Sequence, residues 1–311
     1  MEEEQKKKRG PVFAAIAVLA VLLGIGSYVG YHAMQPAGYQ DYTIQKMQYF
    51  VEYSEQFAYW DVLTIEYPCL SGIEGEQIEP INKIFYDAAF DKVNYWHLYP
   101  DEEVKALQEE YHIFSSDVLC SVPYHSQYLA SVHFEEIYAP VSPIYYVHKT
   151  ERAVNVDLTT GEEYKLSDVI QIDDAFVEFW CEQIDKSGEY DDLAFDDKEP
   201  REAFAVWFLG KDEKLDEYYM FNPFFYIDEN KDLVIGISCD PKPSIVGGYM
   251  PSDDSFSVRI EYEALEPYRI DSEFWDLYEK SESTGEVLEC EDLKENLWLG
   301  KDAGVWDMWK D

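Results

Sequence analysis

Three stretches with alternating apolar residues decide the fold: Asp117–Tyr124 (DVLCSVPY), Gln127–Tyr138 (QYLASVHFEEIY) and Ile144–Leu158 (IYYVHKTERAVNVDL). Apolar side chains recur at about every second position in each stretch, which is the period of a strand with one buried face. Polar or proline-containing breaks separate the stretches. They predict consecutive antiparallel strands at the centre of the protein.

Further strand patterns lie on both sides of these three. Trp60–Pro68 alternates and ends in proline, Phe224–Ile237 predicts a hairpin around a polar turn, and Phe256–Tyr262 alternates strictly. Between Asp157 and Leu166, a loop containing Gly161 joins two β-favouring arms, and we expect a positive φ at this glycine.

Helical periodicity appears between the strands. Apolar residues recur at three- and four-residue spacing from Ile78 to Val93 and from Ala175 to Ile184, and Glu199–Leu209 predicts a third, short helix. Ser167 or Asp168 is the expected cap of the second helix. The predicted fold class is α+β, an antiparallel sheet with helices packed on it.

One transmembrane helix is predicted before this domain. Pro11–Tyr31 (PVFAAIAVLAVLLGIGSYVGY) contains no charge, and its length of ~31 Å as a helix matches a hydrocarbon core of ~30 Å. Lys6, Lys7, Lys8 and Arg9 precede it, and positive charge favours the cytoplasmic side. We therefore expect a single-pass cell-membrane protein with a cytoplasmic tip at 1–10 and an extracellular C-terminal part.

The extracellular part divides into three predicted segments. Residues 32–60, rich in Tyr and Gln, are interpreted as a juxtamembrane stalk, and residues 61–265 as the α+β domain. Residues 266–311 form an acidic, Trp-containing C-terminal extension, in which Phe274, Trp275 and Tyr278 have helical spacing. The sequence leaves open whether this extension docks on the domain.

The charge of the chain favours cationic partners. It has 64 acidic and 24 basic residues, for a formal net charge of −40. Nucleic acid is bound through basic patches, which this composition does not supply, so we expect no nucleic-acid partner. A field of this sign attracts positively charged proteins, peptides or metal ions, although it also serves solubility alone.

No motif of catalysis or cofactor binding stands out. Asp228–Asp232 begins like a calcium loop but has leucine at the sixth position and cysteine at the twelfth, so a polar turn is predicted instead. Adjacent carboxylates such as Glu135–Glu136, Glu162–Glu163 and Asp173–Asp174 arise by chance in so acidic a chain. The six histidines and five widely spaced cysteines form no metal motif, and the disulfide state stays open. No metal and no cofactor are predicted.

Several segments resemble the extracytoplasmic domain of RsiV-like anti-sigma factors, a domain also found beside cell-wall polysaccharide deacetylases. The resemblance covers residues 64–265 and rests on the order of Tyr67–Gly72, Ile81–Asn82, Thr160–Asp168, Phe225–Ile227 and Leu233–Ile235. It implies an α+β binding or sensing domain, and RsiV-like proteins bind lysozyme, a cationic enzyme. Where family members carry Gly-Gly-Ala-His, this chain has Tyr138–Pro143, which predicts an altered ligand-facing loop. With about ten residues before the anchor, no sigma-factor-binding function is carried over.

These observations predict a membrane-anchored, non-enzymatic binding or sensing module for a cationic protein such as lysozyme, or for a cell-envelope component. The candidate ligand-binding residues are Glu135, Glu136, Tyr138, Gly247, Gly248 and Tyr249. Two alternatives remain open: a cell-envelope hydrolase that uses an Asp/Glu pair, and a structural surface protein.

Overall fold

The computed structural model describes residues 42–52, 62–72, 76–110, 114–140, 147–188, 200–210, 218–243, 255–282 and 287–288. All of them belong to the unit Tyr39–Asp311. The predicted anchor at 11–31 and the predicted tip lie outside the described residues. Within the ranges just given, no helix combines the length and the hydropathy that a bilayer crossing requires.

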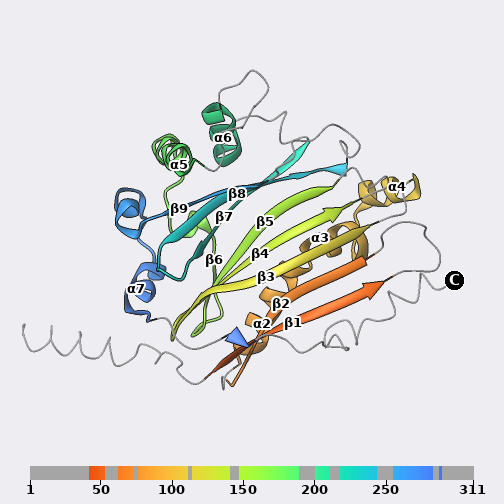
Figure 1. The fold of residues 1–311 in the computed structure, drawn as a ribbon, viewed down its shortest axis with the longest axis horizontal. Helices are drawn as coiled ribbons and strands as arrows, with labels where there is room; N and C mark the ends of the chain where they lie inside the picture. Colours follow the sequence, from red (N-terminus) through yellow and green to blue (C-terminus); the bar gives the residue numbers. More distant parts are fainter. Residues whose placement is uncertain are drawn as a thin grey trace, which may run out of the picture. The chain divides into compact units, whose positions relative to one another are not determined.

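A seven-stranded sheet forms the centre of this unit (Figure 1). Its order is β10-β1-β2-β3-β4-β5-β6. The strands are β1 (Thr43–Glu52), β2 (Val62–Ser71), β3 (Ser115–His125), β4 (Leu129–Ala139), β5 (His148–Asp157), β6 (Glu163–Tyr164) and β10 (Val287–Leu288). The central three antiparallel strands confirm the prediction from the alternating stretches. The sheet is nevertheless mixed, because β2 pairs with β3, and β1 with β10, in parallel.

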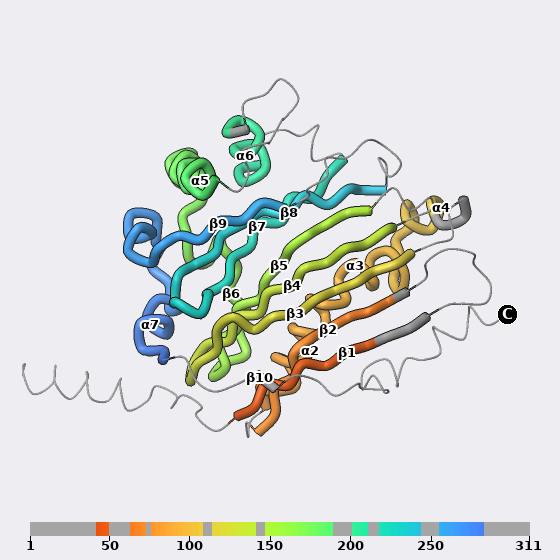
Figure 2. The backbone as a smooth tube through the Cα atoms, in the orientation of Figure 1, coloured from red at the N-terminus to blue at the C-terminus, as the bar shows by residue number. Residues whose placement is uncertain are grey.

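Two sequence expectations about this sheet need correction. Pro68 does not end β2: the β2–β3 pairing is confined to Leu63–Ile65, so the missing N–H of Pro68 interrupts no bond to β3. The predicted stalk contributes β1, which pairs with β2 along its whole length. Figure 2 shows β1 running beside β2, and in the order of the sheet β1 lies between β2 and the short strand β10.

A second, three-stranded antiparallel sheet has the order β7-β8-β9. Its strands are β7 (Tyr219–Ile227), β8 (Leu233–Pro241) and β9 (Ser255–Ile260). A single sheet was expected, but β7 contacts β5 through side chains instead of joining it. Asn155 donates from Nδ2 to the Phe225 carbonyl at 2.7 Å, and the Ile227 N–H donates to Ser131 Oγ at 2.9 Å.

Helices cover the two sheets separately and create two hydrophobic cores. On one face of the large sheet lie α2 (Ile78–Ala89), α3 (Asp91–Val93), the π-helical turn η1 (Asn94–Leu98) and α4 (Glu102–Glu110). The small sheet packs with the 3₁₀ turns η2 (Leu166–Asp168) and η4 (Tyr262–Tyr268) and with α5 (Asp174–Ser187), α6 (Pro200–Leu209) and α7 (Glu273–Lys280).

The sequence patterns account for several details of these elements. Gly161 has φ +79°, as expected for the β5–β6 turn. The cap of α5 is Asp173, whose carboxylate accepts the Phe176 N–H, because Asp168 instead accepts the Lys165 N–H in η2. Part of the C-terminal extension does dock, since Phe274 and Tyr278 of α7 are buried in the core of the small sheet.

Burial of His97 makes the free energy of unfolding depend on pH in the acid range. Its ring stacks on Phe114 with centroids 5.9 Å apart, and burial lowers the pKa of His97 from 6.5 to about 4. The unfolded chain therefore binds a proton at this position that the folded chain does not, and stability falls as the pH drops from about 6.5 towards 4.

We predict that His97→Phe reduces the loss of unfolding free energy between pH 7 and pH 4 by up to about 3 kcal/mol. His97→Gln should also reduce the loss, because it too removes the titrating group. Urea unfolding at both pH values measures the effect. Parallel pH profiles for the wild type and both variants would contradict it.

Candidate functional site

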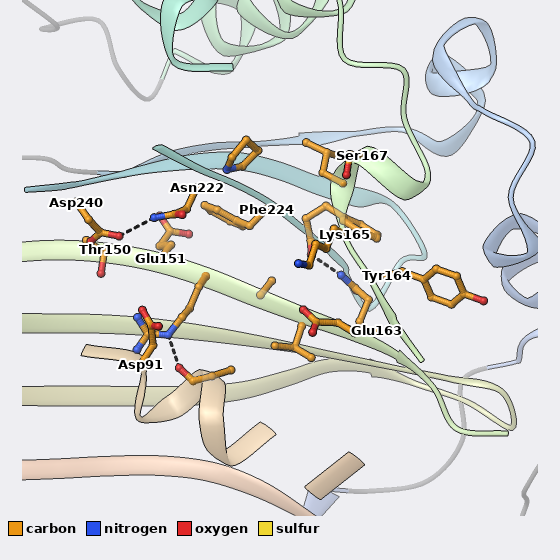
Figure 3. A pocket seen from close by; sticks show the side chains of 18 of the residues that line it. Asp91, Thr150, Glu151, Glu163, Tyr164, Lys165, Ser167, Asn222, Phe224 and Asp240 are labelled. Carbon is orange, nitrogen blue, oxygen red and sulfur yellow. Dashed lines mark hydrogen bonds between the residues drawn. The ribbon is translucent and has the colours of Figure 1, made fainter. Parts of the chain in front are cut away.

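A pocket of about 510 Å³ opens between β5 and β7 (Figure 3). One wall is the run 150–155 of β5, the opposite wall is 222–225 of β7, and residues 163–167 close one end. Asp240, Asn222, Thr150 and Glu151 are grouped at the other end in Figure 3. The pocket exists because β6 pairs with β5 only at Asn155 and Val156 and leaves the preceding part of that strand edge uncovered.

A buried ionic network forms the charged end of the pocket. Lys92 Nζ lies 2.7 Å from Asp240 Oδ2 and 3.1 Å from Asp91 Oδ2. Asp240 also accepts hydrogen bonds from Asn222 Nδ2 at 2.8 Å and from the Tyr138 hydroxyl at 3.3 Å. The Lys92 and Asp240 side chains are 6% and 3% exposed, so neither is solvated well enough to remain charged without its partner.

A second ion pair continues this network. Arg152 Nη2 lies 2.6 Å from Glu136 Oε2, and Ser116 donates to the other carboxylate oxygen of Glu136. Arg152 Nε also donates to the Ala88 carbonyl at 2.6 Å, at the C-terminal end of α2. A cation is favoured at that end by the helix dipole. The network thereby joins α2, α3, β4, β5 and β8.

The network fixes the charges of its members. Burial alone would lower the pKa of Lys92, but Asp240 and Asp91 raise it above the ordinary value. Burial alone would raise the pKa of Asp91, but Lys92 and Arg152 bring it below the usual range. Lys92 therefore stays an ammonium and Asp91 a carboxylate at neutral pH.

Sequence reasoning missed this network, although two signals point to it. Lys92 follows Phe85 by seven residues and therefore lies on the buried face of the helical pattern. Glu136 stands between Phe134 and Tyr138 in the buried set of β4. A charge at a core position indicates a partner elsewhere, but the spacing alone does not say which residue that partner is.

The face of the large sheet that lies opposite α2 carries a second candidate binding surface, which we call the open face. It consists of the outward side chains of β2–β4, beyond the area that the small sheet covers. Leu119 and Ile137 are 53% and 47% exposed. They are diagonal neighbours, since Leu119 pairs with Glu135 and Ile137 with Asp117.

Carboxylates outnumber cations around these two aliphatic side chains. Glu135 lies beside Leu119. Ile137 lies between Asp117 of β3 and the exposed Lys149 of β5. Glu66 accepts a hydrogen bond from the Cys120 N–H at 3.1 Å and lies 3.2 Å from Lys46. Burial and the neighbouring Glu66 both raise the pKa of Asp117. The open face is therefore a small aliphatic patch whose border holds more carboxylates than cations, the cations being Lys149 and Lys46.

The structure separates the six candidate ligand-binding residues. Glu135 is exposed on the open face. Glu136 and Tyr138 are each 1% exposed and belong to the buried network, and burial raises the pKa of Glu136 against the effects of Arg152, Lys92 and Ser116. Gly247, Gly248 and Tyr249 lie outside the described residues.

Other candidate positions have structural roles. Asp228 Oδ1 accepts the Asn230 and Asp232 N–H groups, which makes the predicted turn between β7 and β8. Within the described part of the chain, no three His, Cys, Asp or Glu side chains are arranged to hold a metal ion, and no disulfide joins two of its cysteines.

Comparisons with known proteins return structural neighbours. No family model and no curated protein matches the sequence. A crystal structure of a DUF3298 family member from Bacteroides fragilis superposes with a TM-score of 0.46 at 13% identity, over 78% of this chain and 99% of that chain. A DUF3298 family protein from Pseudomonas aeruginosa gives a TM-score of 0.41 at 10% identity, over 75% and 95%. The narrower resemblance to RsiV-like domains stays a prediction.

We predict that Lys92→Met lowers the free energy of unfolding by about 3–5 kcal/mol, because it leaves Asp240 buried without its ion-pair partner. The matched control is Lys83→Met, whose partner Asp87 is 50% exposed and which should change stability by less than about 0.5 kcal/mol. Urea unfolding compares the two. Equal effects of the two variants would show that the buried pair contributes no more than a surface pair.

Proposed function

We propose that this protein is a non-enzymatic binding module that recognises a basic protein through its open face. The observation that carries the proposal is the exposed pair Leu119 and Ile137 within a border in which carboxylates outnumber cations. A sheet face with exposed aliphatic side chains is suited to contact with another protein, and the surrounding acids select a partner of opposite charge.

The charge of the whole chain supports this choice of partner. A formal net charge of −40 steers basic proteins towards the surface and repels acidic ones. At the open face, burial and then the neighbouring Glu66 raise the pKa of Asp117, so these two carboxylates repel one another in the free protein. A cation bound between them would relieve that repulsion. Lysozyme, the partner that the resemblance to RsiV-like domains implies, is a suitable first probe.

The placement of the module is part of the proposal. The uncharged stretch 11–31 and the four cations before it support a single-pass anchor with the binding domain outside the cell. In that orientation the open face would meet secreted basic proteins or cell-envelope components. The alternative of a hydrolase gains no support from the buried carboxylates, because Glu136 and Asp240 are both occupied by ion pairs.

We predict that full-length protein binds lysozyme or another basic secreted protein with an affinity that falls as salt rises. Leu119→Lys and Ile137→Lys should each weaken this binding roughly tenfold or more, because each removes an apolar contact and adds a repelling charge. Calorimetric titration at low and moderate salt measures both effects.

The matched control is Tyr99→Lys. Tyr99 is 63% exposed and follows η1, on the helix-covered side of the large sheet. This control should bind as the wild type does. The proposal would be overturned if no basic protein bound in a salt-dependent manner, or if Tyr99→Lys weakened binding as much as Leu119→Lys.

A further inference from the structure

One edge of β5 faces the pocket. The direction of its N–H and C=O groups follows from the hydrogen bonds that neighbouring residues of β5 make. The Glu151 N–H donates to Ser238 Oγ and Ser255 Oγ, at 3.0 and 2.8 Å, and therefore points away from β4. The Asp157 N–H likewise points away from β4, towards the Glu162 carbonyl at 2.8 Å. Because backbone groups in a regular strand alternate in direction, the N–H and C=O of Ala153 also point away from β4.

Ala153 lies where neither neighbouring strand covers this edge. It lines the pocket, and β6 pairs with β5 only at Asn155 and Val156. Along β5, the Ser238 and Ser255 hydroxyls bond only to Glu151. Among the described residues, no backbone hydrogen bond joins β5 to β7. The pocket thus leaves room for one more strand segment beside Ala153, in line with β6.

A second observation indicates a ligand at the charged end. Thr150 is 3% exposed and lines the pocket, yet its hydroxyl has no hydrogen-bond partner among the described residues. In Figure 3 it lies beside Asp240 and Asn222. A buried hydroxyl without a partner is costly, and a bound polar group would satisfy it.

The accessible charges of the pocket favour a cation. Lys92 and Arg152 line the pocket but are already paired with buried carboxylates. Asp91 is bonded to Lys92 but its side chain is 54% exposed, and Glu163 is also exposed. Glu151 is 23% exposed and is paired with His133. Lys165 is the exposed cation among the lining residues. The accessible surface therefore carries an excess of negative charge.

We infer that this pocket binds a short, extended, positively charged peptide segment, one residue of which exchanges two backbone hydrogen bonds with Ala153. The segment continues the line of β6 along β5, a mode in which backbone bonds supply affinity and flanking side chains supply specificity. The stretch from Glu151 to Asn155 spans about 13 Å, which fits a segment of a few residues. This site is separate from the open face and does not depend on its function.

The experiment titrates full-length protein with acetyl-Lys-Ala-Lys-amide and follows the heat of binding. Ala153→Pro removes the N–H that points into the pocket, while the strand bonds of Arg152 and Val154 to β4 remain. We expect this variant to bind the peptide roughly tenfold more weakly, or worse. Acetyl-Glu-Ala-Glu-amide should bind at least tenfold more weakly than the lysine peptide to the wild type.

Two further comparisons keep the test decisive. Methylating every backbone nitrogen of the lysine peptide should abolish binding to the wild type, and this comparison replaces Ala153→Pro if that variant does not fold. Glu163→Gln should weaken binding several-fold, whereas Glu162→Gln, its exposed neighbour outside the pocket, should not.

The open-face variant Leu119→Lys should bind the peptide as the wild type does, which separates this site from the proposed function. The inference is overturned if the lysine peptide does not bind, or if it binds equally well after Ala153→Pro and after backbone methylation.

Discussion

The buried ion pair between Lys92 and Asp240 is the constraint on which the arrangement of the two sheets depends. Lys92 belongs to α3, on the helix-covered face of the large sheet, and Asp240 belongs to β8 of the small sheet. Removing both charges from water is costly, so the pair is satisfied only when these elements meet in one geometry. Asn222 and Tyr138 bond to the same carboxylate and tighten that geometry further.

The small sheet can pack in this way because β6 is short. A longer β6 would cover the edge of β5 and occupy the space between β5 and β7. With only two residues in β6, β7 meets the large sheet through side chains. Asn155 bonds to the Phe225 carbonyl and Ser131 to the Ile227 N–H, Leu129 joins the core of the small sheet, and His133 stacks on Tyr226. These side-chain contacts keep β7 from pairing with β5. A pocket lined by the two strands remains between the sheets.

Sequence patterns predict the local elements of this protein and miss the relations between distant ones. Alternation identifies β3, β4 and β5 because the period of a strand is a local property. The division into two sheets depends on which strand edges meet, and Phe224–Ile237 has the same pattern whether or not it joins β5. The ionic network is missed for the same reason, since Lys92 and Asp240 are separated by 148 positions. Lys92 at a core position indicates only that a partner exists.

Glu151 links the open face to the pocket, so a movement at one site would displace a group at the other. Its side chain extends the row of Leu119 and Glu135 across the large sheet and pairs with His133 at 2.9 Å. Its backbone is held by Ser238 and Ser255 of the small sheet, at the end of the pocket. A shift of the small sheet would move this backbone, and with it the carboxylate at the border of the open face. The Lys92–Asp240 pair, which fixes the small sheet against α3, therefore also fixes the position of a charge on the other side of the large sheet.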